Sequence, residues 1–150
     1  MKLQSRSTHP VAAAEAFRRL RDFDALTEFL RAHGVQIAEY KPGWPDGTET
    51  RWRLGVGVKG LHRDIRALVT EVTPEESFTI TVESDGIHGE MRVVTRPEGA
   101  DACTVDYAIE LGARGLGARM MLQPLILARG TIEQKLHNRL TGFTRQRLGL

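Results

Sequence analysis

The sequence predicts an α+β fold in which a curved antiparallel sheet of about six or seven strands wraps around a long C-terminal helix. Between residues 35 and 111, apolar and polar residues alternate in short consecutive stretches separated by turn formers, the pattern of a strand meander. From Met121 onward, apolar residues recur every three or four positions, as in an amphipathic helix. An antiparallel sheet must cover its apolar face, and the terminal helix is the longest element available to do so.

The first 34 residues predict a strand followed by two short helices. Residues 2–8 alternate weakly, and Thr8 or His9 before Pro10 fits a helix cap followed by proline at the first helical position. The inward positions of this first helix are Val11, Ala14, Phe17 and Leu20. Asp22 can cap the second helix, whose inward positions are Phe23, Leu26, Phe29 and Leu30.

The central part of the chain predicts the strands of the sheet. Residues 35–41 form a first stretch, which a dense cluster of turn formers at 42–47 ends. Five further strands follow, joined by short turns such as Lys59-Gly60 and Asp85-Gly86. Alternation places these apolar residues on one shared face: Trp52, Leu54, Val56, Val58, Leu61, Ile65, Ala67, Val69, Phe78, Ile80, Val82, Ile87, Met91, Val93, Cys103, Val105, Tyr107, Ile109 and Leu111.

The terminal segment predicts a helix over residues 117–148, which would be about 48 Å long at about 1.5 Å per residue. Pro124 must start a new segment or kink this helix. We expect its first half, which is richer in apolar residues, to be the more buried. We also expect Leu125, Ile132 and Leu136 to be buried against the sheet.

Charge is distributed unevenly along the chain. The formal net charge of +2 conceals a terminal segment, residues 113–150, with seven Lys and Arg against the single acidic residue Glu133. Such a basic helix can make peripheral contact with a membrane, bind an acidic partner, or face solvent beside the acidic remainder of the chain. Aromatic residues are not interleaved with the basic ones, so a nucleic-acid partner is not expected.

Length and cysteine content favour an ordinary intracellular domain. One hundred and fifty residues suit one domain with its own core, residues 1–150. The single Cys103 permits no internal disulfide, and residues 1–10 contain no apolar signal region. No stretch reaches eighteen apolar residues, so a membrane span is not expected, and the cytoplasm is the simplest location. The oligomeric state is not predicted.

Motifs for cofactors and metals are weak. Residues 55–60 match the glycine pattern of dinucleotide-binding loops, but a strand follows where that motif requires a helix, so a hairpin or bulge is favoured. None of the five histidines has a second His or Cys at zinc-site spacing, and we predict neither a metal nor a cofactor. The pairs His62 with Asp64 and His88 with Glu90 fall on the outer, polar face, where solvated pairs are expected.

Two polar residues fall on the apolar face of the predicted sheet. Tyr107 lies between Val105 and Ile109, where its hydroxyl could meet a ligand or a structural partner such as a backbone carbonyl. Arg63 could pair with an acidic ligand head or lie in water at the mouth of the sheet, unless a bulge near Gly60 turns it outward. Either residue could give a ligand a polar contact.

Three segments together resemble a known superfamily. They are His9-Pro10 leading through Phe17 and Leu20 to Asp22-Phe23, the turn Val72-Thr73-Pro74-Glu75 before Phe78, and the terminal helix after Gly117. In this order they resemble the helix-grip, START-like superfamily, also called SRPBCC, which contains polyketide cyclase/dehydrase-like proteins and the Bet v 1 pollen allergens. The resemblance covers nearly the whole chain, and it implies a deep, mostly apolar cavity between the curved sheet and the long helix.

The resemblance implies two alternative functions. The favoured one is binding or transport of a hydrophobic small molecule, such as a lipid, a polyketide or an isoprenoid-like compound. The alternative is a cyclase- or dehydratase-like enzyme, in which Tyr107 would be the catalytic acid. The expected ligand-binding residues are Trp52, Leu54, Arg63, Ile65, Phe78, Ile80, Met91, Tyr107, Ile109, Met121 and Leu125.

Overall fold

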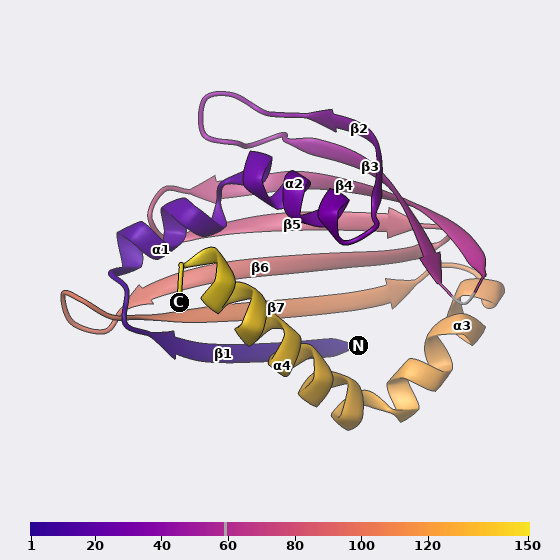
Figure 1. The fold of residues 1–150 in the computed structure, drawn as a ribbon. Coiled ribbons are helices and arrows are strands. Elements are labelled where there is room, and N and C mark those ends of the chain that lie inside the picture. Colours follow the sequence, from indigo (N-terminus) through magenta and orange to yellow (C-terminus); the bar gives the residue numbers. More distant parts are fainter. Residues whose placement is uncertain (59) are drawn as a thin grey trace.

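The computed structural model describes residues 1–58 and 60–150, which form a seven-stranded antiparallel sheet and four helices (Figure 1). The spatial strand order is β1-β7-β6-β5-β4-β3-β2, so the meander from β2 to β7 ends beside the first strand. This confirms the predicted α+β fold with a curved antiparallel sheet. The strands are β1 (Lys2–His9), β2 (Gln36–Lys41), β3 (Arg51–Val58), β4 (Leu61–Thr73), β5 (Ser77–Ser84), β6 (Ile87–Pro97) and β7 (Cys103–Ala113).

Strand register confirms the face assignment made from alternation. Cross-strand partners point to the same side of a sheet, so each pair of partners tests the assignment. The apolar positions are partners of one another through most of the sheet. Examples are Trp52 with Ala67, Val69 with Ile80, Phe78 with Val93 and Val93 with Tyr107. We call this side of the sheet the inner face.

Helices α1 (Ala13–Leu20) and α2 (Phe23–Ala32) cover one end of the inner face. The predicted start of α1 at Pro10 was wrong, because β1 continues to His9, which pairs with Cys103. Ala14 is exposed, and the buried positions of α1 are Ala16, Phe17 and Leu20. The predicted cap of α2 is confirmed: the Asp22 side chain accepts a hydrogen bond from the backbone N–H of Ala25 at 3.0 Å.

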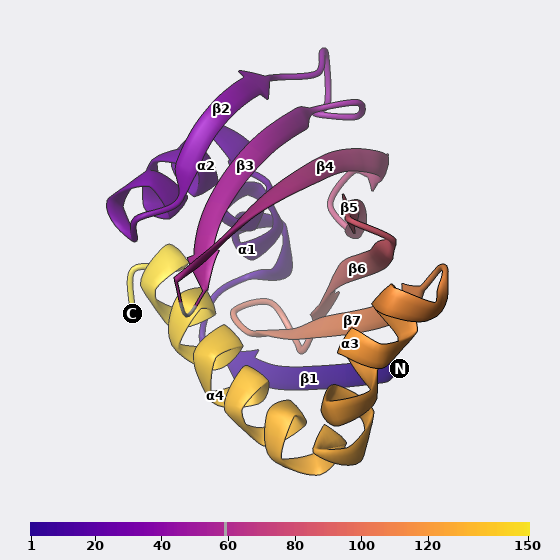
Figure 2. The ribbon, with the colours of Figure 1, turned by 90° about the vertical axis from the view of Figure 1, so that its right-hand side faces the viewer.

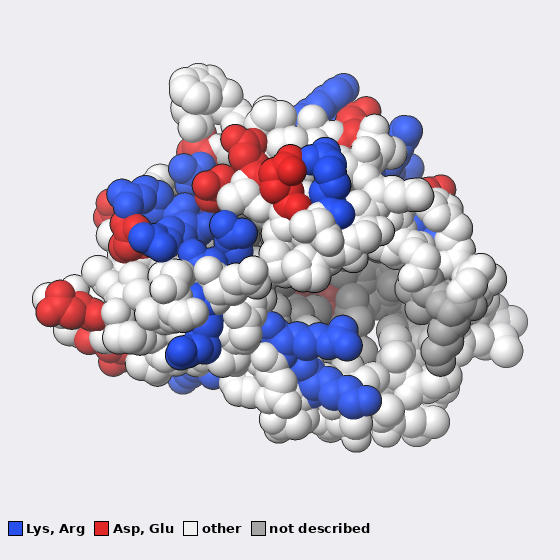
Figure 3. Space-filling model, in the orientation of Figure 1, with Lys and Arg blue, Asp and Glu red and all other residues white. Residues whose placement is uncertain are grey.

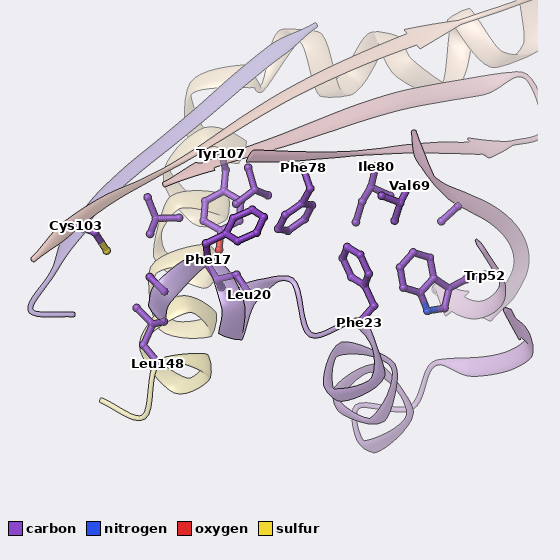
Figure 4. Packing of buried hydrophobic residues seen from close by; sticks show 14 residues of the cluster. Phe17, Leu20, Phe23, Trp52, Val69, Phe78, Ile80, Cys103, Tyr107 and Leu148 are labelled. Carbon is purple, nitrogen blue, oxygen red and sulfur yellow. The ribbon is translucent and has the colours of Figure 1, made fainter. Parts of the chain in front are cut away.

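A row of aromatic rings fills the covered end (Figure 4). Phe78 on β5 lies between Phe17 of α1 and Phe23 of α2, with centroid distances of 6.2 and 5.3 Å and edge-to-face geometry. Phe23 in turn meets Trp52 of β3 edge-to-face at 5.5 Å. The Trp52 indole donates to Thr27 Oγ1 at 2.8 Å, so its polar end is satisfied inside the core. These contacts fix both short helices on the sheet.

The terminal segment forms two helices, α3 (Leu116–Leu127) and α4 (Arg129–Arg147), which meet at an angle (Figure 2). The break is at Ala128, whose φ and ψ of −97° and 18° end α3. Pro124 lies inside α3, so it neither starts a segment nor marks the break itself. The prediction of one helix over residues 117–148 was therefore wrong, although an interruption in this region was expected.

Burial along this segment is the reverse of the expectation. The first half, α3, is largely exposed: Leu116, Met120 and Leu127 expose 76%, 67% and 81% of their surface. Leu125, predicted to be buried, is 39% exposed, and Ile132 and Leu136 are half-buried. The reason is geometric: α4 reaches the core end through Phe143, whose ring lies 5.1 Å from that of Phe29, whereas α3 extends past the end of β6 and β7.

Polar contacts at every fourth residue hold α4 against the edge strand β1. Residues four apart share one face of a helix, so these side chains can follow the strand in step. Because α4 follows the sheet edge, it does not fill the middle of the inner face. The contacts are Arg129 Nε to the Lys2 carbonyl at 2.9 Å, the Gln4 N–H to Glu133 Oε2 at 3.0 Å, and Ser5 Oγ with His137 Nδ1 at 2.7 Å.

The three glycines of the 55–60 pattern lie in or next to strands β3 and β4. Gly55 and Gly57 belong to β3, Gly60 has φ of +80°, and β4 begins at Leu61. Lys59, which the predicted turn includes, lies outside the described residues. Since a strand follows the glycines, the pattern does not present a helix N-terminus to a phosphate. No described helix is long and apolar enough to cross a bilayer.

Candidate functional site

The inner face has a packed half and an open half. In the packed half, α1, α2 and the end of α4 cover Phe78, Ile80 and Tyr107, which are at most 6% exposed. Toward α3 the same face carries apolar side chains that are only partly buried, and the surface is hollowed there, between α3, α4 and strands β3 and β4 (Figure 3). The residues of this open half are Leu54, Ile65, Val82, Ile87, Met91, Ile109 and Leu111.

A pocket of about 210 Å³ lies in the open half, lined by Arg63, Ile65, Val82, Glu83, Ser84 and Ile87. Three of these residues contribute aliphatic side chains from neighbouring strands of the inner face. On the helices that flank the hollow, Leu122 of α3 is only 5% exposed, and Ile132 and Leu136 share one stripe of α4 with Leu140, which packs on the core. The residues that line the pocket itself belong to strands β4, β5 and β6.

Arg63 is the basic residue among those that line this pocket, and it lies at the mouth with part of its side chain in solvent; the other polar lining residues are Glu83 and Ser84. It pairs with Val56 in an unbroken β3–β4 register, so no bulge near Gly60 turns it outward. Its Nη2 lies 3.0 Å from Met121 Sδ on α3, and its Nη1 lies 3.4 Å from Asp85 Oδ2, while 23% of its side chain is exposed. A thioether is a weak acceptor and the Asp85 side chain is 81% exposed, so these contacts hold the guanidinium weakly. The guanidinium can still donate to an acidic ligand.

Tyr107 has a structural partner. Its hydroxyl lies 2.6 Å from Thr144 Oγ1, which itself donates to the Leu140 carbonyl at 2.7 Å. Since the single Thr144 hydrogen goes to Leu140, the Tyr107 O–H is the donor in the other bond. Burial is the main cause that raises the pKa of Tyr107 to about 12. The phenol therefore stays protonated at neutral pH, with its hydrogen directed toward α4.

This bond leads to a first prediction. Replacing Tyr107 with phenylalanine should lower the free energy of unfolding by about 0.5–1.5 kcal/mol, the net value of a typical buried hydrogen bond. Affinity for a bound apolar ligand should not change. Denaturant unfolding of the variant, of Thr144→Val and of the double variant checks this as a double-mutant cycle. A coupling energy near zero, together with weaker ligand binding, would instead mean that the hydroxyl serves the ligand.

Histidine side chains on both faces of the sheet pair with polar side chains. On the outer face, His62 Nε2 meets Asp64 Oδ1 at 2.9 Å, and both side chains are more than half exposed, as solvated pairs are. On the inner face, His137 of α4 meets Ser5, which is 4% exposed. The inner pair was missed from the sequence, because Ser5 stands in a weakly alternating strand and His137 was considered only as a metal ligand.

The predicted ligand-binding residues divide between the two halves of the inner face. Four lie in the packed core: Trp52, Phe78, Ile80 and Tyr107. Five are half-buried in or beside the open half, and two lie on α3 with larger exposure. Those seven are Leu54, Arg63, Ile65, Met91, Ile109, Met121 and Leu125.

The sequence-based set omitted several residues that border the hollow. Val82, Ile87 and Leu111 were assigned to the correct face by alternation but were not selected as ligand-binding residues. Leu122, which is buried on the inward face of α3, was not among the residues predicted to face the sheet. Alternation tells which face of the sheet a residue points to. It does not tell which end of that face the short helices cover, and this decides which residues border the hollow.

Two larger depressions, of about 790 and 810 Å³, lie mainly on the outer face. Charged side chains line both, including Arg6, Glu90 and Arg92 in the first and Arg53, Arg66 and Glu83 in the second. Shallow, open depressions of this kind arise from the twist of the sheet. Their charged lining does not suit an apolar molecule, so the smaller inner-face hollow is the better candidate site.

Comparison with solved structures shows what this chain resembles. The protein TTHA0849 from Thermus thermophilus superimposes with a TM-score of 0.68 at 17% identity, covering 99% of this chain and 97% of that one. Zhui aromatase/cyclase from a Streptomyces species gives 0.66 at 13% identity, covering 99% and 95%. Norcoclaurine synthase from Thalictrum flavum gives 0.64 at 11% identity, covering 90% and 89%.

No family model matches the chain, and no curated protein matches it by sequence. At these identities the structural matches establish the fold, which nearly the full length of the chain shares. The predicted helix-grip fold is thereby confirmed, and the structure of Ara h 8.0201 shares it with a TM-score of 0.63 at 14% identity, covering 99% of this chain and 95% of that one. A shared fold leaves the chemistry to be argued from the site itself.

Proposed function

We propose that the protein binds a hydrophobic small molecule, with a lipid-, polyketide- or isoprenoid-like skeleton, in the open half of the inner face. The observation that carries this proposal is the row of apolar side chains beneath α3 that are only partly buried, in a face that is otherwise packed. Leaving contiguous apolar surface in contact with water is unfavourable by roughly 25 cal/mol per Å², and a bound apolar molecule would remove that contact.

Arg63 adds a chemical preference to this proposal. Its guanidinium lies at the mouth of the apolar pocket, and among the described residues it is held only by a thioether and an exposed carboxylate. A molecule with an acidic end and an apolar body would place the acid at Arg63 and the body against Ile65, Val82 and Ile87. We therefore favour an amphiphilic acid over a neutral hydrocarbon-like ligand.

Blocking the hollow tests the proposal. A fluorescent fatty-acid analogue should bind the wild-type protein, and Ile65→Trp should weaken binding at least about tenfold, because the indole occupies the pocket of about 210 Å³. Ile65 is half-buried at the pocket wall, so the fold should tolerate the change better than at Ile80, which is 6% exposed in the packed core. Fluorescence titration measures the affinity.

Leu68→Trp is the matched control, because Leu68 lies on the same strand but faces outward, where it pairs with Thr81. It should leave dye affinity unchanged. If Ile65→Trp also binds normally, or if both variants lose binding equally, the hollow is not the site. Native mass spectrometry of the purified protein would identify the class of any molecule retained through purification.

A cyclase-like enzyme is the alternative function, and it has weaker support. Two of the similar structures carry the names of catalysts, an aromatase/cyclase and a synthase, so the fold accommodates such chemistry. For this chain, a catalytic Tyr107 would have to deliver its proton into the hollow, whereas its O–H is directed to Thr144. Binding requires no such rearrangement and is the function we favour.

A further inference from the structure

Helix α3 is apolar on two opposite faces. Its inward face carries Ala118 and Leu122, which are 7% and 5% exposed. Leu116, Met120 and Leu127 are spaced by four and seven residues and so share another face, where they are 67–81% exposed. A surface helix normally presents polar residues to water, and a contiguous apolar face turned outward marks a contact surface.

The charged residues of this segment of the sequence are all of one sign. The sequence contains no acidic residue between Glu110 and Glu133, and the arginines in that interval are Arg114, Arg119 and Arg129. All three are exposed. Arg129 is engaged with the Lys2 carbonyl and lies 3.7 Å from Glu133, whereas no ion pair of Arg114 or Arg119 occurs among the residues that the structure describes.

We propose that α3 docks on an anionic lipid bilayer. Leu116, Met120 and Leu127 would enter the boundary between headgroups and acyl chains, with α3 parallel to the membrane plane, while Arg114 and Arg119 contact lipid phosphates. The combination of an outward apolar face with flanking basic residues is the chemistry that such a surface recognises. This places the membrane contact on α3, whereas the charge pattern of the sequence pointed to the whole basic terminal segment.

A bilayer fits this face better than a second copy of the chain. Two copies meeting through α3 would bring their arginines together without a carboxylate from the same segment to separate them, which is unfavourable. Docking also suits the neighbouring hollow, because Met121 of α3 contacts Arg63 at its mouth. When the protein is docked, the mouth of the hollow would thus lie close to the lipid surface. Binding of α3 to vesicles does not depend on whether the hollow holds a ligand.

Vesicle co-sedimentation tests the inference. Wild-type protein should bind vesicles of phosphatidylcholine with about 30% phosphatidylserine at least about fivefold more tightly than vesicles of phosphatidylcholine alone. The double variant Leu116→Gln/Leu127→Gln should lose at least about fivefold in affinity for the anionic vesicles, and Arg119→Gln should lose about threefold or more. Both leucines are exposed, so thermal unfolding should be nearly unchanged.

Trp44→Gln is the matched control, because Trp44 is 90% exposed in the loop between β2 and β3, far from α3 (Figure 1). Its vesicle binding should equal that of the wild type. Three results would overturn the inference: loss of binding in Trp44→Gln but not in the α3 variants, equal binding to neutral and anionic vesicles, or no vesicle binding. In the last case, sedimentation equilibrium showing a dimer that the α3 variants abolish would identify a second copy as the partner.

Discussion

Replacing Phe78 with alanine is expected to lower the free energy of unfolding by about 3–5 kcal/mol, the range for phenylalanine truncated in a packed core. Phe78 is 4% exposed, and its ring makes edge-to-face contacts with Phe17 and Phe23. These two contacts join α1 and α2 to the sheet, so truncation opens a cavity between three elements at once. Urea denaturation of the variant measures the loss.

Leu136→Ala provides the comparison within the same protein. Leu136 is only half-buried on α4, so its truncation leaves no enclosed cavity and should cost only about 1–2 kcal/mol. The loss in unfolding free energy should be smaller for Phe78→Leu than for Phe78→Ala, because leucine retains part of the apolar volume. If Leu136→Ala proved as destabilising as Phe78→Ala, α4 would be packed on the sheet along its whole length, and the hollow would not exist in solution.

The sheet could be predicted from the sequence because its signals are local. Alternation in Phe78, Ile80 and Val82 reports the face of each residue directly, and turns such as Asp85-Gly86 mark where strands reverse. The Asp22 cap is equally local, because its side chain accepts a hydrogen bond from the N–H of Ala25, only three residues away. These predictions agree with the structure.

The terminal segment was predicted less well, because periodicity cannot tell which partner covers a helix. The apolar residues of α3 suggested burial, but Leu116 and Leu127 point away from the sheet. The path of α4 depends on polar contacts with β1, such as Ser5 with His137, which join residues 132 positions apart. A contact at that separation leaves no pattern in a short window of sequence.

The candidate site shows the same limit. Tyr107 and Arg63 were both correctly placed on the inner face, but their surroundings differ: one is buried against Thr144, and the other stands at the mouth of the hollow. Their difference depends on the position of α1, α2 and the end of α4 along the strands. The sequence therefore predicted the face that carries the candidate site and missed the boundary between its packed and open halves.

Arg63→Met is expected to weaken binding of a long-chain carboxylic acid about 10–100-fold, while binding of the alcohol of the same chain length changes less than about twofold. Hydrogen bonds to a charged group contribute about 1.5–3 kcal/mol, which corresponds to this loss in affinity. Methionine retains an unbranched apolar side chain next to Met121, so the walls of the pocket are preserved. Competition against a bound fluorescent probe measures both ligands.

Two further variants separate charge recognition from packing. Arg63→Lys keeps the positive charge but loses the fork of donors, so acid affinity should fall between those of the wild type and Arg63→Met. Arg66→Met removes an arginine from the outer face of the same strand and should leave both affinities unchanged. Equal losses for acid and alcohol in Arg63→Met would assign Arg63 a packing role. No loss for either ligand would mean that the acidic end binds elsewhere, because a guanidinium at the mouth of an apolar pocket cannot be removed without cost to a carboxylate that it contacts.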